Sequence, residues 1–378
     1  MQAAPLTALK QPIALQTVAD PVAAPGHAIV RLKAAALNHR DLWIQQGLYA
    51  KIQLPVVLGS DGAGIVISVG ADADRAWVGQ DVIINPSLDW GTDPRAQGPQ
   101  FRILGMPDSG TFAEQISIPV ANLAPKPAHL SWEQAAALPL AGLTAWRALF
   151  TRAHLKAGER VLVTGVGGGA ALFALQFAGA AGARVFVTSS SAEKISRAQA
   201  LGAQGGVNYR DADWSEQLLK LAGAAFDVIV DSAGGEGFAS LIDLTKPGGR
   251  LAFFGATTGN PKSLDVRKCF FPPDQPARHD DGLARRLRRH DRAGRREKSH
   301  ARRRQSFPAR PGRRRAAPHG SQRAVRQDRA GLLTLIVGQS RRPRREQVVG
   351  SEWRGSDPAL HPSVISLSAR APCRAGIR

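Results

Sequence analysis

Cysteine is scarce in this chain, with only Cys269 and Cys373 among 378 residues. Two cysteines exclude a disulfide framework and a four-thiolate zinc lobe, and they indicate a reducing compartment. The chain also has no run of about 18 apolar residues, and its N-terminus lacks a basic region followed by an apolar core. We therefore expect a cytoplasmic protein without a membrane segment.

Acidic residues are scarce in only one part of the chain. Residues 1–271 hold 23 Lys and Arg against 21 Asp and Glu, whereas residues 272–378 hold 27 against 9. A strongly basic folded surface would indicate a nucleic-acid or membrane partner, but the net charge of +20 lies almost entirely in the last part. The first part is long enough for two domains with sizeable cores.

Residues 159–188 predict a strand, a glycine turn, a helix and a second strand. The apolar run Val161–Val163 precedes the turn, residues 170–181 are long and apolar enough for a helix, and 184–188 form the second strand. The segment fits the pattern G-x-G-x-x-G/A, with the register open by one residue, through Gly165, Gly167, Gly168, Gly169 and Ala170. Glycines let backbone N–H groups and the positive end of the helix dipole approach a pyrophosphate. An ordinary tight turn is the alternative, but the flanking strand and helix favour dinucleotide binding.

The end of the second strand bears on the choice of cofactor. An NAD-binding unit usually has Asp or Glu there, whereas this chain has Ser189, Ser190 and Ser191, followed by Lys194 and Arg197. Hydroxyls and cations at this point favour NADP(H). The same serines also suit a helix N-cap, and the two interpretations are compatible.

The remaining pattern predicts an α/β protein in two parts. Short β-rich runs separated by turn residues predict a mostly antiparallel domain over residues 1–125. From 126 to 271, a helical stretch with Ser131 as N-cap is followed by alternating strands and helices, which predict a doubly wound parallel sheet. Ligands bind beyond the carboxyl ends of such strands, so we expect the cofactor near Ser232, Phe254 and Gly255.

Five spaced motifs carry a resemblance to a known family. They are the glycine turn and the segments LNHRDLWIQQGLY (37–49), LPVVLGSDGAGIVISVG (54–70), GTFAEQISIP (110–119) and LPLAGLTAWRAL (138–149). Together they resemble the medium-chain dehydrogenase/reductase superfamily, and within it the zinc-less quinone oxidoreductase and alcohol dehydrogenase-like branch. The resemblance covers residues 1–271 and implies a GroES-like catalytic domain, a Rossmann NADP-binding domain and a homodimer for the intact family member.

The resemblance also implies site residues. Asn38 and Thr144 are expected beside the nicotinamide, with Tyr49 near the substrate and Asp41 as an anchor behind them. Each has a structural alternative: Asp41 can cap a helix starting at DLWIQQ, Tyr49 can be packing, and Thr144 can satisfy its own backbone. In the resembling family the segment that ends at Tyr209 and Arg210 lies near the adenosine 2′-phosphate, so both are candidate NADP contacts.

The same comparison of motifs predicts no zinc. Zinc members of the superfamily carry a cysteine where Asn38 stands and a histidine where Ser60 follows Gly59, and neither asparagine nor serine is a good zinc ligand. Asp61 and His39 alone do not complete a catalytic set of three strong donors.

The absence of a Lewis acid favours certain substrates. Reducing a simple ketone without a metal is difficult, whereas the charge that develops on a quinone or an activated C=C bond delocalises into an oxyanion that hydrogen-bond donors can hold. We therefore expect an NADPH-dependent reductase of a quinone or an α,β-unsaturated carbonyl. The alternatives are an alcohol dehydrogenase-like oxidoreductase and a cofactor-binding protein without turnover.

In residues 272–378 the family pattern gives way to Arg, Pro, Ala, Gly and His. One interpretation is an arginine-rich arm for nucleic acid, and a second is a solvated linker. The third, which we favour, is a shifted reading frame, because codons compatible with PPDQPARHDDGLA and VRQDRAG also permit RQISLLGTTMGSP and FGKIVL, an ending typical of the family. This hypothesis predicts an irregular tail, no nucleic-acid partner, and a product with uncovered apolar faces and low or absent activity.

Overall fold

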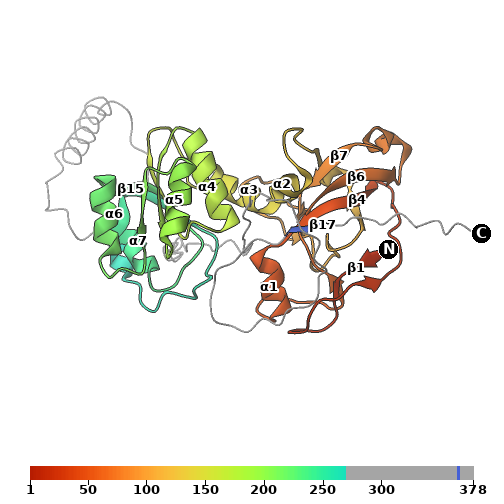
Figure 1. Ribbon diagram of the computed structural model, residues 1–378, viewed down its shortest axis with the longest axis horizontal. Helices are drawn as coiled ribbons and strands as arrows, with labels where there is room; N and C mark the ends of the chain where they lie inside the picture. Colours follow the sequence, from red (N-terminus) through yellow and green to blue (C-terminus); the bar gives the residue numbers. More distant parts are fainter. Residues whose placement is uncertain (270–363, 367–378) are drawn as a thin grey trace, which may run out of the picture. The chain divides into compact units, whose positions relative to one another are not determined.

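The computed structural model describes residues 1–269 and 364–366 (Figure 1). Residues 1–264 belong to one compact unit, whereas a second unit begins at Asp265 and is described only by the 3₁₀ turn Val266–Cys269. The expectations for 272–378 lie outside the described residues, apart from the strand β17 at Val364–Ser366. The β-branched residues Val364 and Ile365 suit this short extended segment.

The N-terminal part is built on an antiparallel sheet, as the short β-rich runs predicted. Its strand order is β10-β4-β6-β7-β11, and β17 also pairs with β4. These strands are β4 (His27–Ala36), β6 (Asp61–Val69), β7 (Asp81–Ile84), β10 (Gln115–Pro119) and β11 (Leu123–Pro125). Inward-facing residues of the strands, such as Val30, Val66 and Ile116, form one buried cluster.

Short strand pairs and one helix complete this part. The pairs are β1 (Gln2–Ala3) with β3 (Gln16–Thr17), β2 (Pro5–Leu6) with β5 (Val56–Val57), and β8 (Ser87–Leu88) with β9 (Arg102–Ile103). Helix α1 (His39–Gln45) follows β4 directly. It therefore begins where the sheet's longest strand ends, which fixes the position of its first turn.

The helical stretch after residue 131 is not one helix. It divides into α2 (Trp132–Ala136), α3 (Pro139–Trp146) and a π-helical turn (Arg147–Arg152). The break occurs because Pro139 lacks an N–H and takes the N1 position of a new helix. The predicted capping box of α2 is confirmed, since the Gln134 N–H donates to Ser131 Oγ at 3.2 Å and the Ser131 N–H to Gln134 Oε1 at 3.0 Å.

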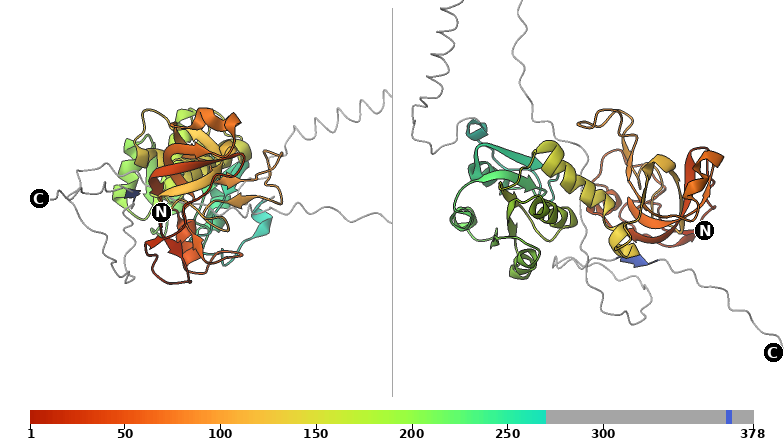
Figure 2. Two further views of the ribbon diagram at one scale, coloured as in Figure 1. Left: turned by 90° about the vertical axis from the view of Figure 1, so that its right-hand side faces the viewer. Right: turned by 90° about the horizontal axis from the view of Figure 1, so that it is seen from above.

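The second part contains the predicted parallel sheet, in the order β14-β13-β12-β15-β16. Its strands are β12 (Arg160–Val163), β13 (Arg184–Ser189), β14 (Gly205–Asn208), β15 (Phe226–Asp231) and β16 (Thr245–Phe253); its helices are α4 (Gly169–Ala180), α5 (Ala192–Ala200), α6 (Trp214–Ala222) and α7 (Phe238–Leu244). Alternate strand residues enter two separate clusters, because successive side chains point to opposite faces. Val161 and Val163 pack with α4 residues, whereas Leu162 packs with residues of α6 and α7. The helices thus cover both faces, as Figure 2 shows.

No helix among the described residues combines the length and apolar character needed to cross a bilayer.

Candidate active site

The glycine turn joins β12 to the start of α4. Gly165 has φ +60° and Gly167 has φ +136°, conformations that L side chains rarely adopt. The Gly165 N–H donates to Thr188 Oγ1 at 3.2 Å, which fixes the turn against β13. Helix α4 begins at Gly169, and the first N–H groups of a helix have no partner within it. The turn therefore offers backbone donors to an anion.

Polar residues gather where β13 and β14 end. The strands pair so that Ser189 lies opposite Asn208, and the Tyr209 N–H donates to Ser189 O at 3.2 Å. Ser190 follows directly, and Ser191 caps α5 by accepting from the Lys194 N–H at 3.3 Å. The helix-cap interpretation of the serines is thus confirmed at Ser191.

Lys194 connects this group to the glycine turn. A Cβ built on Gly167 would lie 2.8 Å from Lys194 Cδ and 3.5 Å from its Nζ, so the lysine side chain lies against the turn. The structure therefore brings Lys194, the serines and Tyr209 to the same edge of the sheet as the predicted pyrophosphate site.

The loops after β15 and β16 touch each other. A Cβ on Gly255 would lie 2.5 Å from Ser232 O, and Thr257 Oγ1 donates to the same carbonyl at 3.3 Å. The structure thus brings Ser232 and Gly255 together. Phe254, by contrast, packs against the hydrophobic cluster that contains α4.

Asp231 is a site residue that the sequence analysis missed. Its Oδ1 accepts from Thr164 Oγ1 at 2.5 Å, and its Oδ2 accepts from the Gly234 N–H at 2.9 Å. Burial raises the pKa of this carboxyl, although the hydrogen bonds oppose the shift. The carboxylate ties the start of the glycine turn to the loop after β15. The signal was available, because an apolar strand ends in an acid directly before a Ser-Ala-Gly-Gly turn.

Asn38 and Asp41 form a capping box at the start of α1. The Asn38 N–H donates to Asp41 Oδ2 at 2.8 Å, and the Gly59 N–H donates to Asp41 Oδ1 at 3.3 Å. Asp41 is therefore the N3 residue of a helix that starts two residues earlier than DLWIQQ. Burial raises its pKa to about 6, against the effect of these hydrogen bonds and of the Arg40 charge.

Asp61 is fully buried at the start of β6 and contacts two helices. Its Oδ2 accepts from Asn38 Nδ2 at 3.0 Å, and its Oδ1 accepts from the Leu140 N–H in the first turn of α3 at 2.8 Å. Burial raises the pKa of Asp61 to about 7; the two hydrogen bonds lower it and the nearby Asp41 charge raises it. Thr144, one turn along α3, donates its hydroxyl proton to Leu140 O at 2.9 Å.

The donor set at this place does not fit a zinc ion. Asn38 turns its nitrogen toward Asp61, and Ser60 Oγ donates to Leu104 O at 2.7 Å while it accepts from Arg40. Within residues 1–269 and 364–366, no group of three His, Cys, Asp or Glu side chains is arranged to hold a metal. Because catalytic zinc needs three strong ligands, the residues present offer no such site.

Arg40 is a second residue that the sequence analysis missed. Its guanidinium is only 2% exposed and donates to the carbonyls of Ile103, Leu104 and Met106 at 2.7 to 3.2 Å. The Tyr49 ring lies over it, with its centroid 5.2 Å from Arg40 Cζ. Arg40 therefore holds the segment 103–106 against the first turn of α1.

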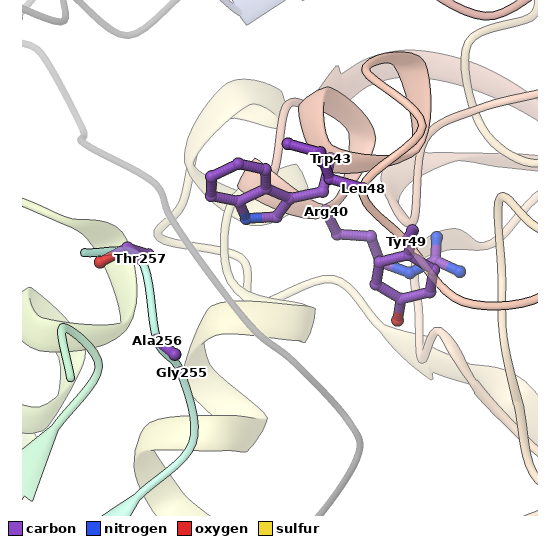
Figure 3. Close-up of a pocket in the computed structure, with 7 residues that line it drawn as sticks. All are labelled: Arg40, Trp43, Leu48, Tyr49, Gly255, Ala256 and Thr257. Carbon is purple, nitrogen blue, oxygen red and sulfur yellow. The ribbon is translucent and has the colours of Figure 1, made fainter. Parts of the chain in front are cut away.

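A cavity of about 290 Å³ lies beside this arginine (Figure 3). Its wall comprises Arg40, Trp43, Leu48, Tyr49, Gly255, Ala256 and Thr257. The indole of Trp43 extends toward the loop after β16, whereas the ring of Tyr49 lies beside Arg40, as Figure 3 shows. The structure thus brings Tyr49 and Gly255 into the lining of the same cavity, whereas Asn38 and Thr144 are buried and do not line it.

Comparisons with known proteins agree with this architecture. Residues 24–128 match the family described as alcohol dehydrogenase GroES-like domain, and residues 165–273 match the family described as zinc-binding dehydrogenase. The chain is 38% identical over 265 residues to a zinc-type alcohol dehydrogenase-like protein, YogA, of Leptosphaeria maculans, which covers 66% of this chain and 74% of the relative.

Solved structures give the same result. The crystal structure of an NAD-dependent alcohol dehydrogenase has a TM-score of 0.67 at 39% identity and covers 71% of this chain and 82% of its own. A quinone oxidoreductase of Pseudomonas syringae pv. Tomato DC3000 has a TM-score of 0.60 at 30% identity and covers 71% and 78%. The chain therefore belongs to the medium-chain dehydrogenase/reductase superfamily of NAD(P)-dependent oxidoreductases.

Proposed function

We propose that this protein is an NADPH-dependent reductase of quinones or α,β-unsaturated carbonyls. The observation that carries the proposal is the Asn38–Asp61–Leu140 network, which fills with hydrogen bonds the place where zinc members of the superfamily hold their metal. With no Lewis acid, the developing negative charge on the acceptor must be delocalised and held by hydrogen-bond donors. A conjugated carbonyl meets that requirement better than a simple ketone does.

The cavity supports a flat, apolar acceptor. Trp43, Leu48 and Tyr49 line it together with Arg40, and the loop at 255–257 lines the opposite side. Aromatic side chains favour offset or edge-to-face contact with another ring. The Tyr49 hydroxyl is a donor for the substrate oxygen, and a proton from solvent completes the product.

The glycine turn fits a dinucleotide. The backbone N–H groups from Gly167, Gly168, Gly169 and Ala170 would meet the pyrophosphate, and the reduced nicotinamide supplies a hydride from C4 when bound. The Thr144 hydroxyl donates a hydrogen bond to Leu140 O. Its lone pairs would therefore accept a hydrogen bond from the carboxamide of the nicotinamide.

The choice of NADPH rests on the end of β13. The strand ends in Ser189 rather than an acid, and Lys194 lies against the glycine turn nearby. Ser190 and Tyr209 would complete the pocket for the 2′-phosphate, while Ser232 and Gly255 would adjoin the rest of the cofactor. A carboxylate that would repel a 2′-phosphate is absent from the end of this strand.

The second candidate is an alcohol dehydrogenase-like oxidoreductase. It is favoured by the names of the fungal relative and of the solved NAD-dependent neighbour.

We expect NADPH to bind at least about tenfold more tightly than NADH and to be oxidised by quinones and enones. Equal or tighter binding of NADH would overturn the cofactor assignment, and turnover only with simple alcohols or ketones would favour the second candidate.

A further inference from the structure

Asp61 contacts one of the two residues implied at the nicotinamide directly and is linked to the other through the backbone of Leu140. Its Oδ2 holds the Asn38 amide at 3.0 Å, and its Oδ1 holds the Leu140 N–H at 2.8 Å. Leu140 O in turn accepts the hydroxyl proton of Thr144. One buried carboxylate therefore fixes the N-cap of α1 and the first turn of α3 at once.

The sequence of α3 explains why a carboxylate is suited to this position. Pro139 at N1 has no N–H, so Leu140 carries the first backbone donor of the helix. Helix N-termini favour a negative charge. Both partners of Asp61 are donors, so the ionised carboxylate satisfies both, whereas a proton on either oxygen removes the charge and makes the carboxyl a weaker acceptor for these two bonds.

Among the described residues, few charged groups lie near the Asp61 carboxylate. From α1, the Asp41 carboxylate opposes its ionisation. Arg40 directs its guanidinium to Ser60 and to the carbonyls of 103–106. From α3 only a backbone N–H faces Asp61, and Thr111 donates its hydroxyl to the Asp61 carbonyl oxygen rather than to the carboxylate. The two hydrogen bonds to Oδ1 and Oδ2 therefore determine how well the ionised form is held.

Building on the proposed function, we propose that Asp61 is a positioning residue of the reaction, whose ionised carboxylate holds Asn38 and the Thr144 turn of α3 in the arrangement that receives the nicotinamide and substrate. In this proposal Asp61 itself contacts neither the nicotinamide nor the substrate. Its effect is expected in kcat, because misplaced groups reduce the rate of a bound complex more than they reduce binding at the distant pyrophosphate turn.

The test exchanges the two side chains in the full chain. D61N sets two amides against each other, and N38D sets two carboxylates about 3 Å apart. The double variant N38D/D61N restores one donor and one acceptor across the same contact, and the new amide at position 61 still accepts from Leu140. We expect each single variant to lose at least about tenfold in kcat and the double variant to return to within about threefold of the natural chain.

Two further measurements separate positioning from general structural damage. NADPH affinity, followed by fluorescence, is expected to change less than about twofold in all three variants. The matched control is D231N, another buried carboxylate, which is expected to weaken NADPH binding because Asp231 holds the glycine turn. A double variant no better than the poorer single variant, or single variants within twofold of the natural chain, would overturn the proposal.

The pH dependence of kcat tests the role of Asp61 in the natural chain, without any substitution. Because the ionised form holds both partners, kcat is expected to rise as the pH passes about 7, and infrared spectroscopy should show a carboxyl titrating there that D61N lacks. A flat kcat profile between pH 6 and 8, or an unchanged infrared titration in D61N, would count against Asp61. If the natural chain does not bind NADPH, the proposed function fails instead, and the infrared titration still reports on Asp61.

Discussion

At the scale of single residues, the two buried carboxyls near α1 oppose stability at neutral pH. Unfolded Asp has a pKa of about 3.9, whereas burial raises the pKa of Asp41 to about 6 and that of Asp61 to about 7. The folded state therefore binds more protons than the unfolded state between these values, and its stability falls as pH rises from about 4 to 7. We expect thermal denaturation to show a lower Tm at pH 7.5 than at pH 5, with a smaller decrease in D61N. An equal decrease in D61N would contradict this assignment.

Lys194 is the residue at which cofactor choice can be tested most directly. Its side chain lies against Gly167, and a 2′-phosphate there would gain a charged partner. We expect K194Q to weaken NADPH binding about tenfold in a fluorescence titration and to leave NADH binding within about twofold. R197Q is the matched control, because Arg197 pairs with Glu193 on the surface of α5. If K194Q weakens both cofactors equally, Lys194 does not recognise the 2′-phosphate.

Sequence patterns anticipated the residues that follow a strand or precede a helix. Ser189 and Gly167 were predictable because strand, turn and helix occupy adjacent positions in the chain. The sequence did not predict that Asp61 binds the first turn of α3 or that Arg40 binds the carbonyls of 103–106. Their partners, Leu140 and residues 103–106, lie far along the sequence. Contacts of that kind depend on tertiary packing, which no local pattern specifies.

At the scale of elements, the turn between β12 and α4 requires glycine at a defined position. Gly167 has φ +136°, and a Cβ there would meet Lys194. We expect G167A to cost about 1 to 3 kcal/mol in the free energy of unfolding and to reduce NADPH affinity at least about tenfold. The matched control is G179A inside α4, where a Cβ meets nothing within 4 Å and alanine should stabilise the helix by about 0.5 to 1 kcal/mol. Equal effects of the two substitutions in denaturation would refute the requirement.

The order and type of the main strands were predictable, but some boundaries were not. The apolar runs predicted β12 and β15 closely, whereas the short β-rich runs at 28–32 and 64–69 cover only parts of β4 and β6. The stretch after Ser131 was predicted as one helix because its composition is helical throughout. Proline at 139 divided it, since a proline favours the start of a helix over its interior.

At the scale of the whole molecule, the parallel sheet has β16 at one end of its strand order. In the described residues β16 pairs with β15 and is partly exposed along its length. An edge strand without a partner or cover favours association. We therefore expect the natural chain to associate on heating, and we propose that a chain with its frame restored after residue 271 forms the homodimer implied by the family resemblance.

The reading-frame hypothesis predicts a large difference between these two chains. Restoring the frame supplies apolar strand segments in place of the arginine-rich sequence, and we expect a Tm higher by several degrees and a turnover at least about tenfold greater. Calorimetry, sedimentation and NADPH oxidation on both chains measure this difference. Equal stability and turnover would contradict the reading-frame hypothesis.

The carbonyl cage around Arg40 has a consequence for how the segment 103–106 withstands harsh conditions. The partners of the Arg40 guanidinium are backbone oxygens, which do not titrate. These three hydrogen bonds therefore involve neither a metal ion nor a carboxyl group. Overnight dialysis against EDTA should therefore leave the amide hydrogens of this segment as slow to exchange as before.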